Sequence, residues 1–309
     1  MSANNKRKKT IITLRRHKKE GKKTVLVTAY DYPQALLADQ AGVDIILVGD
    51  SIGMTTLGYK TTIPVTMDAM ILHSEAVGRG VRNAFLIGDM PFMSYQPSDQ
   101  MAIENAGRFI QAGMDCVKVE GAMIDRIKSI CNSGIMVMSH LGLTPHTRAK
   151  LGGYKVQGKT ARTTQIILEE ALNLQEAGCS FLLLEAMPAE SADFITNKLD
   201  IPVYGIGAGN RVDGQLVIMH DLIGLFWEFK SKFVKRYCEA GIIIQKALEE
   251  YSIDVREGNF PTKENFYVIK EEELEKLLGD SSWKYEKIRV ENLAKPGHSA
   301  TPKNSKKEK

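Results

Sequence analysis

The sequence has few cysteines and no long hydrophobic run, and each shortage excludes a class of protein. Only four cysteines occur in 309 residues, with no C-x-x-C pair among them: Cys116, Cys131, Cys179 and Cys238. This pattern is typical of a reducing, cytosolic compartment and argues against a structural zinc site. The longest apolar runs, such as 45–48 and 181–184, are far shorter than the ~18 residues that span a membrane. Because no apolar segment follows the basic N-terminus, no secretory signal is expected.

Positive charge is also scarce in the middle of the chain. The net charge is +4, but residues 1–23 carry +9 and residues 280–309 carry +4, which leaves about −9 for the segment between them. A nucleic-acid-binding domain would carry its basic residues on the folded core, so this distribution argues against one. We interpret the two basic ends as solvated, flexible extensions, with tethering to RNA or to a membrane surface as the alternative.

The composition, with 43% hydrophobic and 25% charged residues, is that of an ordinary globular protein. Apolar runs that end in a polar residue or a glycine-containing turn recur along the chain. We interpret eight of them as strands: 24–31, 44–50, 84–89, 115–120, 135–140, 180–185, 201–207 and 215–220. Segments with helical periodicity lie between them, for example after the N-cap candidate Ser98 and over 163–177.

The alternation of strand and helix predicts an α/β fold with a parallel sheet. We favour a closed (β/α)8 TIM barrel, with an open doubly wound sheet as the alternative. The predicted organisation is a basic N-terminal extension over 1–23 that includes a short helix, a barrel over 24–265, and a C-terminal extension over 266–309. Residues 243–279 are predicted to form further helix. Disorder is expected from about residue 295, where Lys, Ser, Pro and Asn predominate.

Carboxylates stand at four of the predicted strand ends: Asp50, Asp89, Glu120 and Glu185. Lys118 faces the same side of its strand as Glu120, because residues two apart share a face. In a barrel the strand ends converge on the C-terminal face, where such enzymes place their active sites. One acid at a strand end is more often a helix cap or a loop brace, but four acids together need a counter-ion. Oxygen ligands without a Cys and His cluster suit Mg²⁺ or a similar divalent cation.

Ten ordered blocks between about residues 10 and 260 add information that spacing alone does not carry. They are VTAYDYPQA (27–35), LVGDSIGMTTLGY (47–59), PVTMDAM (64–70), GDMPFMSY (88–95), VKVEG (117–121), SHLGLTPH (139–146), GGYKVQGK (152–159), LLLEAMP (182–188), YGIGAGN (204–210) and DGQLVIMHD (213–221). These blocks resemble the 3-methyl-2-oxobutanoate hydroxymethyltransferase family, also called ketopantoate hydroxymethyltransferase. The segment past about residue 265 is not part of the family core.

The resemblance implies a (β/α)8 barrel enzyme of pantothenate and coenzyme A biosynthesis. Its reaction transfers a hydroxymethyl group from the co-substrate 5,10-methylenetetrahydrofolate to 3-methyl-2-oxobutanoate. The product is 2-dehydropantoate, formed through a Mg²⁺-stabilised enolate. The resemblance also implies a homo-oligomer, often a decamer of two stacked pentamers. We expect a cytoplasmic enzyme with small-molecule substrates and with neither a nucleic-acid nor a membrane partner.

Carried over by motif, the resemblance also implies the roles of particular residues. The Mg²⁺ ligands would be Asp50, Asp89 and Glu120. The residues in contact with the keto acid would be Asp50, Ser51, Asp89 and Lys118. Glu185 would be the base that removes the C3 proton, a function worth ~10²–10⁴-fold in rate.

Other residues have two interpretations. His140 either orients a ligand or assists proton transfer, or it is a structural, hydrogen-bonded histidine. The stretch GIGAGN (205–210) resembles a phosphate-binding loop, but its place after the seventh strand favours a tight turn. Six further residues either line the keto-acid and pterin sites or only support the structure: Tyr30, Phe92, Met93, Tyr95, Tyr154 and Lys155.

Two other functions are open to a chain with these residues. A Mg²⁺-dependent enzyme for another 2-oxo acid on the same barrel, such as a lyase or a phosphonomutase, would use the same enolate chemistry without folate. A non-catalytic binding protein is the second alternative, and the retention of every matched carboxylate argues against it.

The charged ends generate the first prediction. Removal of residues 1–5 and 295–309 should leave activity and melting temperature almost unchanged, because these stretches lack the apolar residues needed to join a core. Turnover assays and thermal denaturation of the shortened and full-length chains test this. A large loss of activity or of assembly would show that the ends are docked.

Overall fold

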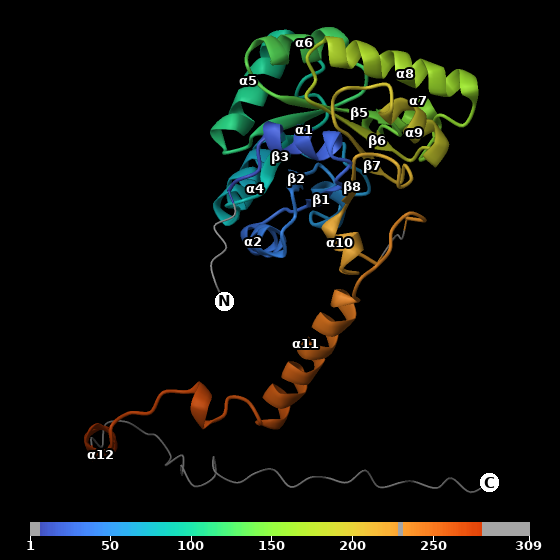
Figure 1. Cartoon of the computed structure of the whole chain (residues 1–309). Coiled ribbons are helices and arrows are strands. Elements are labelled where there is room, and N and C mark those ends of the chain that lie inside the picture. The colour runs from blue at the N-terminus through green and yellow to red at the C-terminus, as the bar shows by residue number, and fades with distance from the viewer. Residues whose placement is uncertain (1–6, 228–230, 280–309) are drawn as a thin grey trace, which may run out of the picture. The chain divides into compact units, whose positions relative to one another are not determined.

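Eight parallel strands close into a barrel in the computed structural model, which describes residues 7–227 and 231–279. Each strand pairs with its neighbours in the chain, and the first strand pairs with the last (Figure 1). The strands are β1 Thr24–Thr28, β2 Ile45–Val48, β3 Phe85–Asp89, β4 Cys116–Glu120, β5 Val137–Gly142, β6 Phe181–Glu185, β7 Val203–Ile206 and β8 Gly214–Val217. The predicted TIM barrel is therefore confirmed, and the open sheet is excluded.

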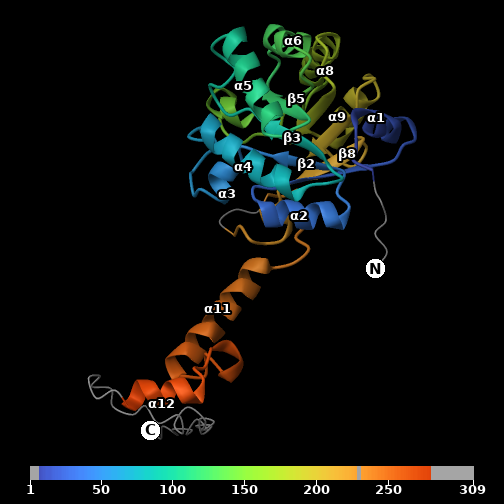
Figure 2. The same cartoon turned by 90° about the vertical axis from the view of Figure 1, so that its left-hand side faces the viewer.

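Helices surround the barrel (Figure 2). The helices of the barrel unit are α1 Ile11–Lys19, α2 Tyr32–Ala41, α3 Ile52–Thr55, α4 Met67–Gly80, α5 Asp99–Gln111, α6 Ile124–Asn132, α7 Arg148–Leu151, α8 Ala161–Glu176, α9 Ala189–Thr196 and α10 Met219–Leu222, with a 3-10 turn, η1, at Pro145–Thr147. Ser98 caps α5 as predicted, because its side chain accepts a hydrogen bond from the Met101 amide. Helix α8 begins two residues earlier than position 163, since Thr160 and Thr163 form a capping box.

Side chains along each strand alternate between the barrel interior and the helical layer, and this alternation decides which side chains at the strand ends point inward. On β6, Phe181 and Leu183 join the cluster that fills the interior, whereas Leu182 and Leu184 join the cluster under the helices. The final residue, Glu185, has the inward parity of Leu183. Strand β6 therefore presents apolar side chains at one end of the interior and a carboxylate at the other.

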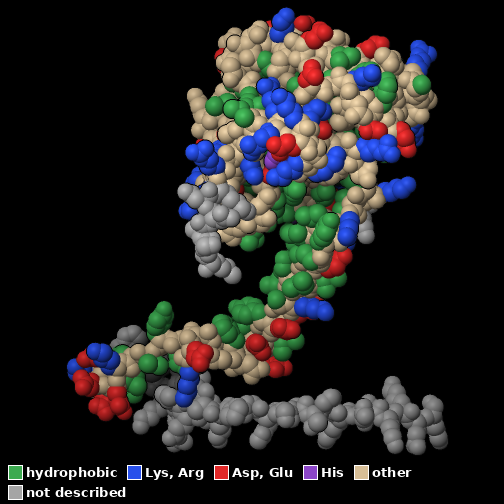
Figure 3. Space-filling model, viewed as in Figure 1, with side chains coloured by type: hydrophobic (Ala, Val, Ile, Leu, Met, Phe, Trp, Pro, Cys, Tyr) green, Lys and Arg blue, Asp and Glu red, His purple; other side chains and the backbone are tan. Residues whose placement is uncertain are grey.

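Helix α1 closes the N-terminal end of the barrel. Leu14 is fully buried within the interior cluster. Three lysines near the helix form ion pairs with aspartates that each precede a strand: Lys8–Asp115 at 2.9 Å, Lys9–Asp44 at 3.3 Å and Lys18–Asp213 at 2.8 Å. Lys and Arg side chains gather over α1 in Figure 3. The prediction of a flexible basic end is therefore wrong for residues 7–23, because Leu14 and Ile11 pack against the interior cluster and complementary aspartates pair with the lysines.

The chain divides into two compact units between Ala240 and Gly241. Beyond the barrel unit, the predicted helix over 243–279 is confirmed as two separate helices, α11 Ala240–Glu257 and α12 Glu271–Gly279, with a 3-10 turn, η2, at Lys263–Asn265 between them. The predicted limits of the extensions, at 23/24 and 265/266, stay predictions, and the segment 295–309 lies outside the described residues. Among the described helices, none has the length and apolar character needed to cross a membrane.

The docking of α1 generates a stability prediction. Leu14→Ala should lower the free energy of unfolding by ~2–5 kcal/mol, because it leaves a cavity at the base of the closed barrel. Ile12→Ala on the same helix is the matched control, since the Ile12 side chain is 76% exposed. Urea unfolding followed by circular dichroism measures both. An equal and small effect of the two substitutions would show that α1 does not seal the barrel.

Candidate active site

The strand ends bring the predicted polar residues together at the C-terminal face of the barrel. Asp89, Glu120 and Glu185 are the last residues of β3, β4 and β6. The strand register sets Asp89 beside Lys118 and Glu120 beside His140. Neighbouring parallel strands lie about 4.8 Å apart, so these side chains share one small volume. The convergence expected from a barrel is therefore present.

An ion pair lies at the centre of this group. The Lys118 ammonium donates a hydrogen bond of 2.7 Å to Oδ1 of Asp89, and both residues are almost completely buried. The backbone N–H of Asp50 donates to Oδ2 of Asp89 at 3.1 Å, so both oxygens of Asp89 have a partner. Burial and the charge of Asp50 nevertheless raise the pKa of Asp89. Burial alone would lower the pKa of Lys118, but the charges of Asp89, Asp50 and Glu120 raise it, so Lys118 stays cationic.

His146 is a member of this group that the sequence did not single out. Its ring Nε2 lies 2.7 Å from Oδ2 of Asp50, and its backbone N–H donates to Oε1 of Glu120 at 2.7 Å. The hydrogen bond and the charge of His146, together with the charge of Lys118, outweigh burial and lower the pKa of Asp50. The sequence held only one signal for His146, its place at the end of the block SHLGLTPH (139–146). The η1 turn returns the chain to the strand ends.

Asp50 and Glu120 each have one carboxylate oxygen without a hydrogen-bonding partner among the described residues. Oδ1 of Asp50 and Oε2 of Glu120 accept no hydrogen bond from any donor in the described part of the chain. Nδ1 of His140 and Nδ1 of His146 each lie 3.9 Å from Glu120 Oε2, too far for a hydrogen bond. Burial raises the pKa of the Glu120 carboxyl. These two oxygens are free to accept a cation or a bound water.

Glu185 and His140 form the other side of the site. Oε2 of Glu185 lies 3.1 Å from Nε2 of His140, but the two groups are not aligned for a hydrogen bond, and both ring nitrogens of His140 are buried without a partner among the described residues. Burial and the charge of Lys118 lower the pKa of His140 to about 3, so the ring is neutral. Burial raises the pKa of Glu185 to about 8, although 18% of its side chain is exposed. Glu185 is thus the more basic and the more accessible of the two.

A glycine allows β5 and β6 to approach each other at this end. Gly142 has a φ of +90°, and a Cβ added to it would lie 2.4 Å from the carbonyl oxygen of Glu185. That carbonyl accepts a hydrogen bond of 2.9 Å from the Leu143 amide. Only glycine tolerates both the backbone conformation and the contact, so Gly142 helps to place Glu185.

Ser51 and the remaining candidates occupy different surroundings. The Ser51 hydroxyl lies 2.7 Å from the phenolic oxygen of Tyr30, which is fully buried and packs against the ring of His220. The hydrogen bond with the buried Tyr30 therefore holds the Ser51 hydroxyl in place. Tyr154 is exposed and lies beside Arg148. The described contacts do not join Tyr154 or Lys155 to the strand-end carboxylates.

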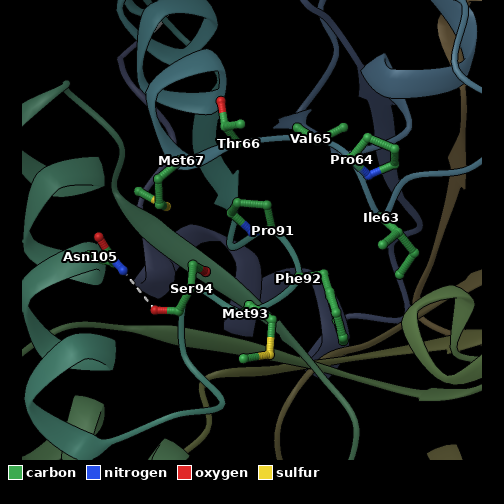
Figure 4. Close-up of a pocket in the computed structure, with 10 residues that line it drawn as sticks. All are labelled: Ile63, Pro64, Val65, Thr66, Met67, Pro91, Phe92, Met93, Ser94 and Asn105. Carbon is green, nitrogen blue, oxygen red and sulfur yellow. Dashed lines mark hydrogen bonds between the residues drawn. The ribbon is translucent and has the colours of Figure 1, made fainter.

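A cavity lies beside the loop that follows β3. It has a volume of about 410 Å³ and is lined by Ile63, Pro64, Val65, Thr66, Met67, Pro91, Phe92, Met93, Ser94 and Asn105 (Figure 4). The Asn105 amide donates to the Ser94 carbonyl at 2.7 Å and fixes one wall. The ring of Phe92 meets that of His146 edge-on, with centroids 5.7 Å apart. Phe92 and Met93 thus line a cavity next to the site, whereas Tyr95 is buried within the structure.

A closed parallel barrel whose strand ends gather carboxylates, a lysine and two histidines is an arrangement typical of TIM-barrel enzymes. Its family follows from its sequence. The chain matches the family described as ketopantoate hydroxymethyltransferase over residues 8–263, and it belongs to that family. The resemblance seen in the ten sequence blocks is confirmed.

Individual relatives and structures agree with this assignment. The 3-methyl-2-oxobutanoate hydroxymethyltransferase of Alkaliphilus metalliredigens is 49% identical, with 88% of this chain and 98% of the relative covered. That of Clostridium novyi is 45% identical, with 87% and 99% covered. Among solved structures, a phosphonopyruvate hydrolase complex with oxalate and Mg²⁺ has a TM-score of 0.56 at 13% identity, with 88% of this chain and 95% of that chain covered. A phosphoenolpyruvate phosphomutase from Streptomyces platensis has a TM-score of 0.54 at 14% identity, with 87% and 95% covered. At such low identity these structures establish the fold alone.

Proposed function

We propose that this chain transfers a hydroxymethyl group from 5,10-methylenetetrahydrofolate to 3-methyl-2-oxobutanoate and forms 2-dehydropantoate for pantothenate synthesis. The family and the names of the relatives support the reaction class and the acceptor. The observation that carries the proposal is the arrangement of charges within the site. A buried lysine and aspartates form one group, and Glu185, with a raised pKa, lies on another strand.

The donor set fits a Mg²⁺ ion held together with the keto acid. Four carboxylates at the strand ends face the cationic Lys118 and the paired His146, and burial raises the pKa of three of them, Asp89, Glu120 and Glu185. Within the described residues, no three His, Cys, Asp or Glu side chains are grouped closely enough to hold a metal by themselves. Mg²⁺ does not require such a cage, because it usually takes one or two carboxylates, waters and substrate oxygens. Asp50 and Asp89 would hold it, with Glu120 nearby or through a water.

When bound, Mg²⁺ would supply positive charge that stabilises an enolate oxygen. The residues of the chain perform the remaining tasks. Lys118 stays charged and holds an anionic oxygen of the keto acid. Ser51, supported by Tyr30, offers a hydroxyl beside Asp50. Glu185 takes the C3 proton, because its raised pKa makes it a stronger base than an ordinary glutamate.

The assay for this function is direct. Formation of 2-dehydropantoate should require both the divalent cation and methylenetetrahydrofolate, and omission of either should stop it. Turnover of the keto acid without folate would instead favour a lyase-type reaction on the same barrel.

The proposal also includes a cytoplasmic homo-oligomer. The resemblance implies that the assembly is a decamer, and sedimentation equilibrium of the full chain tests the subunit number.

The metal assignment predicts the effect of Asp89→Asn. The amide keeps the shape and one oxygen for Lys118 but loses the acceptor of the Asp50 N–H. The barrel should still fold, because its packing does not involve this group, but the loss of a negative charge should abolish turnover and weaken Mg²⁺ binding. Calorimetric titration of Mg²⁺ in the presence of 3-methyl-2-oxobutanoate measures this. Asp68→Asn is the control, because Asp68 is exposed and forms an ion pair with Arg108 at the surface. Unchanged metal affinity in Asp89→Asn would remove Asp89 from the metal site.

The base assignment predicts the effect of Glu185→Gln. Proton removal alone can be followed as deuterium incorporation at C3 of the keto acid by NMR, without folate. Glu185→Gln should lower this exchange and hydroxymethyl transfer together, by ~10²-fold or more, while substrate affinity changes little. Glu170→Gln on α8 is the control, since burial also raises the pKa of Glu170 outside the site.

The pH dependence of the exchange gives a second readout for Glu185. Only the ionised carboxylate can accept a proton, and its pKa is raised to about 8. The exchange rate of the unmodified enzyme should therefore rise as the pH increases through about 8, reach half of its maximum near that pH, and level off only above it. The Gln variant should lack this rise. Exchange at the unmodified rate in Glu185→Gln, with only transfer impaired, would place Glu185 on the folate side of the site.

A further inference from the structure

His146 contacts two carboxylates of the site through two different parts of the same residue. Its ring Nε2 lies 2.7 Å from Oδ2 of Asp50, and its backbone N–H donates to Oε1 of Glu120 at 2.7 Å. Asp50 follows β2 and Glu120 ends β4, so this one residue ties together two strand ends that do not pair with each other.

The ring itself has little freedom to move. His146 is buried, and its Nδ1 lies 3.2 Å from the phenolic oxygen of Tyr95, which in turn accepts the Glu120 amide hydrogen at 3.2 Å. The ring of Phe92 packs against it edge-on. Whether the ring is neutral with its proton on Nε2 or doubly protonated, Nε2 carries a hydrogen toward Asp50. The contact with Asp50 therefore does not depend on the charge of the ring.

We propose that His146 is a positioning residue that holds one oxygen of Asp50 and one of Glu120, and so presents the other oxygen of each, Asp50 Oδ1 and Glu120 Oε2, to the divalent cation and its water. The inference rests on the metal site of the proposed function. Donors behind metal-binding carboxylates fix the orientation of these groups, and their removal typically lowers metal affinity ~10–100-fold. A purely structural histidine would affect stability and leave metal affinity unchanged.

Two amide substitutions separate the contacts of the ring. A glutamine side chain can place its N–H close to the position of Nε2, and so toward Asp50. An asparagine side chain is shorter and reaches only the position of Nδ1, toward Tyr95. Both leave the backbone N–H to Glu120 in place and both are polar and uncharged. The pair His146→Gln and His146→Asn therefore tests the Nε2 contact in particular.

The experiment measures the affinity of the full chain for Mn²⁺ by electron paramagnetic resonance, with and without 3-methyl-2-oxobutanoate. We expect His146→Asn to bind Mn²⁺ ~10–100-fold more weakly than the unmodified chain, and His146→Gln to lie within a few-fold of it. The rate constant kcat should fall in the Asn variant and recover in the Gln variant. His17→Asn is the control, since His17 is buried beside Thr24 at the opposite end of the barrel.

The outcomes divide cleanly. Equal Mn²⁺ affinity in the Asn variant and the unmodified chain would overturn the positioning role, and so would a Gln variant as weak as the Asn variant. If the Asn variant does not fold, as judged by circular dichroism, His146→Ser replaces it in the same comparison, because it too lacks a donor that reaches Asp50. An unmodified chain that binds no Mn²⁺ would overturn the metal site of the proposed function and this inference with it. If the unmodified chain binds Mn²⁺ and forms product, but His146→Asn and His146→Gln have the same Mn²⁺ affinity as each other, only this inference is overturned and the proposed function stands.

Discussion

The ion pair between Lys118 and Asp89, 2.7 Å long and buried at the end of the barrel, is the interaction on which the site depends. Removing two charges from water is costly, and a buried pair of this kind adds little net stability compared with apolar residues of the same size. The ion pair instead fixes the charge and the orientation of the groups around it. Lys118 stays cationic, Asp89 keeps a fixed orientation, and the Asp50 amide has a partner. The other charged groups are arranged around this pair.

The two ends of the barrel interior have different physical tasks. At one end, apolar side chains such as Phe85 and Phe181 pack with Leu14 of α1. This packing supplies hydrophobic stabilisation in proportion to the area removed from water. At the other end the same strands present carboxylates whose burial is unfavourable by itself. Stability is therefore concentrated away from the site, and this allows a group of like charges to be held together for binding and catalysis.

Much of the fold could be predicted because it follows from local patterns. The apolar runs indicated all eight strands, and Ser98 indicated the start of a helix. Both signals are local, because the spacing of apolar residues and the N-cap of a helix are properties of short segments. Other features depended on contacts between distant segments. The docking of α1 requires Leu14 to meet the barrel interior, and this contact joins the N-terminal helix to strands far along the chain, which the sequence alone does not show. The start of α8 at Ala161 is different, because it depends on a local capping box between Thr160 and Thr163.

The sequence by itself determined the strand–helix order, the family, and the acids that end the strands, because each of these follows from a pattern within a short stretch of the chain. Only the tertiary structure decided how the acids differ. Asp89 is paired with Lys118, Asp50 with His146, and Glu185 has an unaligned neutral histidine as its neighbour. These partners come from strands and turns far apart in the chain, and the pKa of a carboxyl depends on burial and nearby charge rather than on its own sequence context. Closure of the barrel brings those charges together, and so only the folded molecule distinguishes the paired carboxylates of Asp50 and Asp89 from that of Glu185.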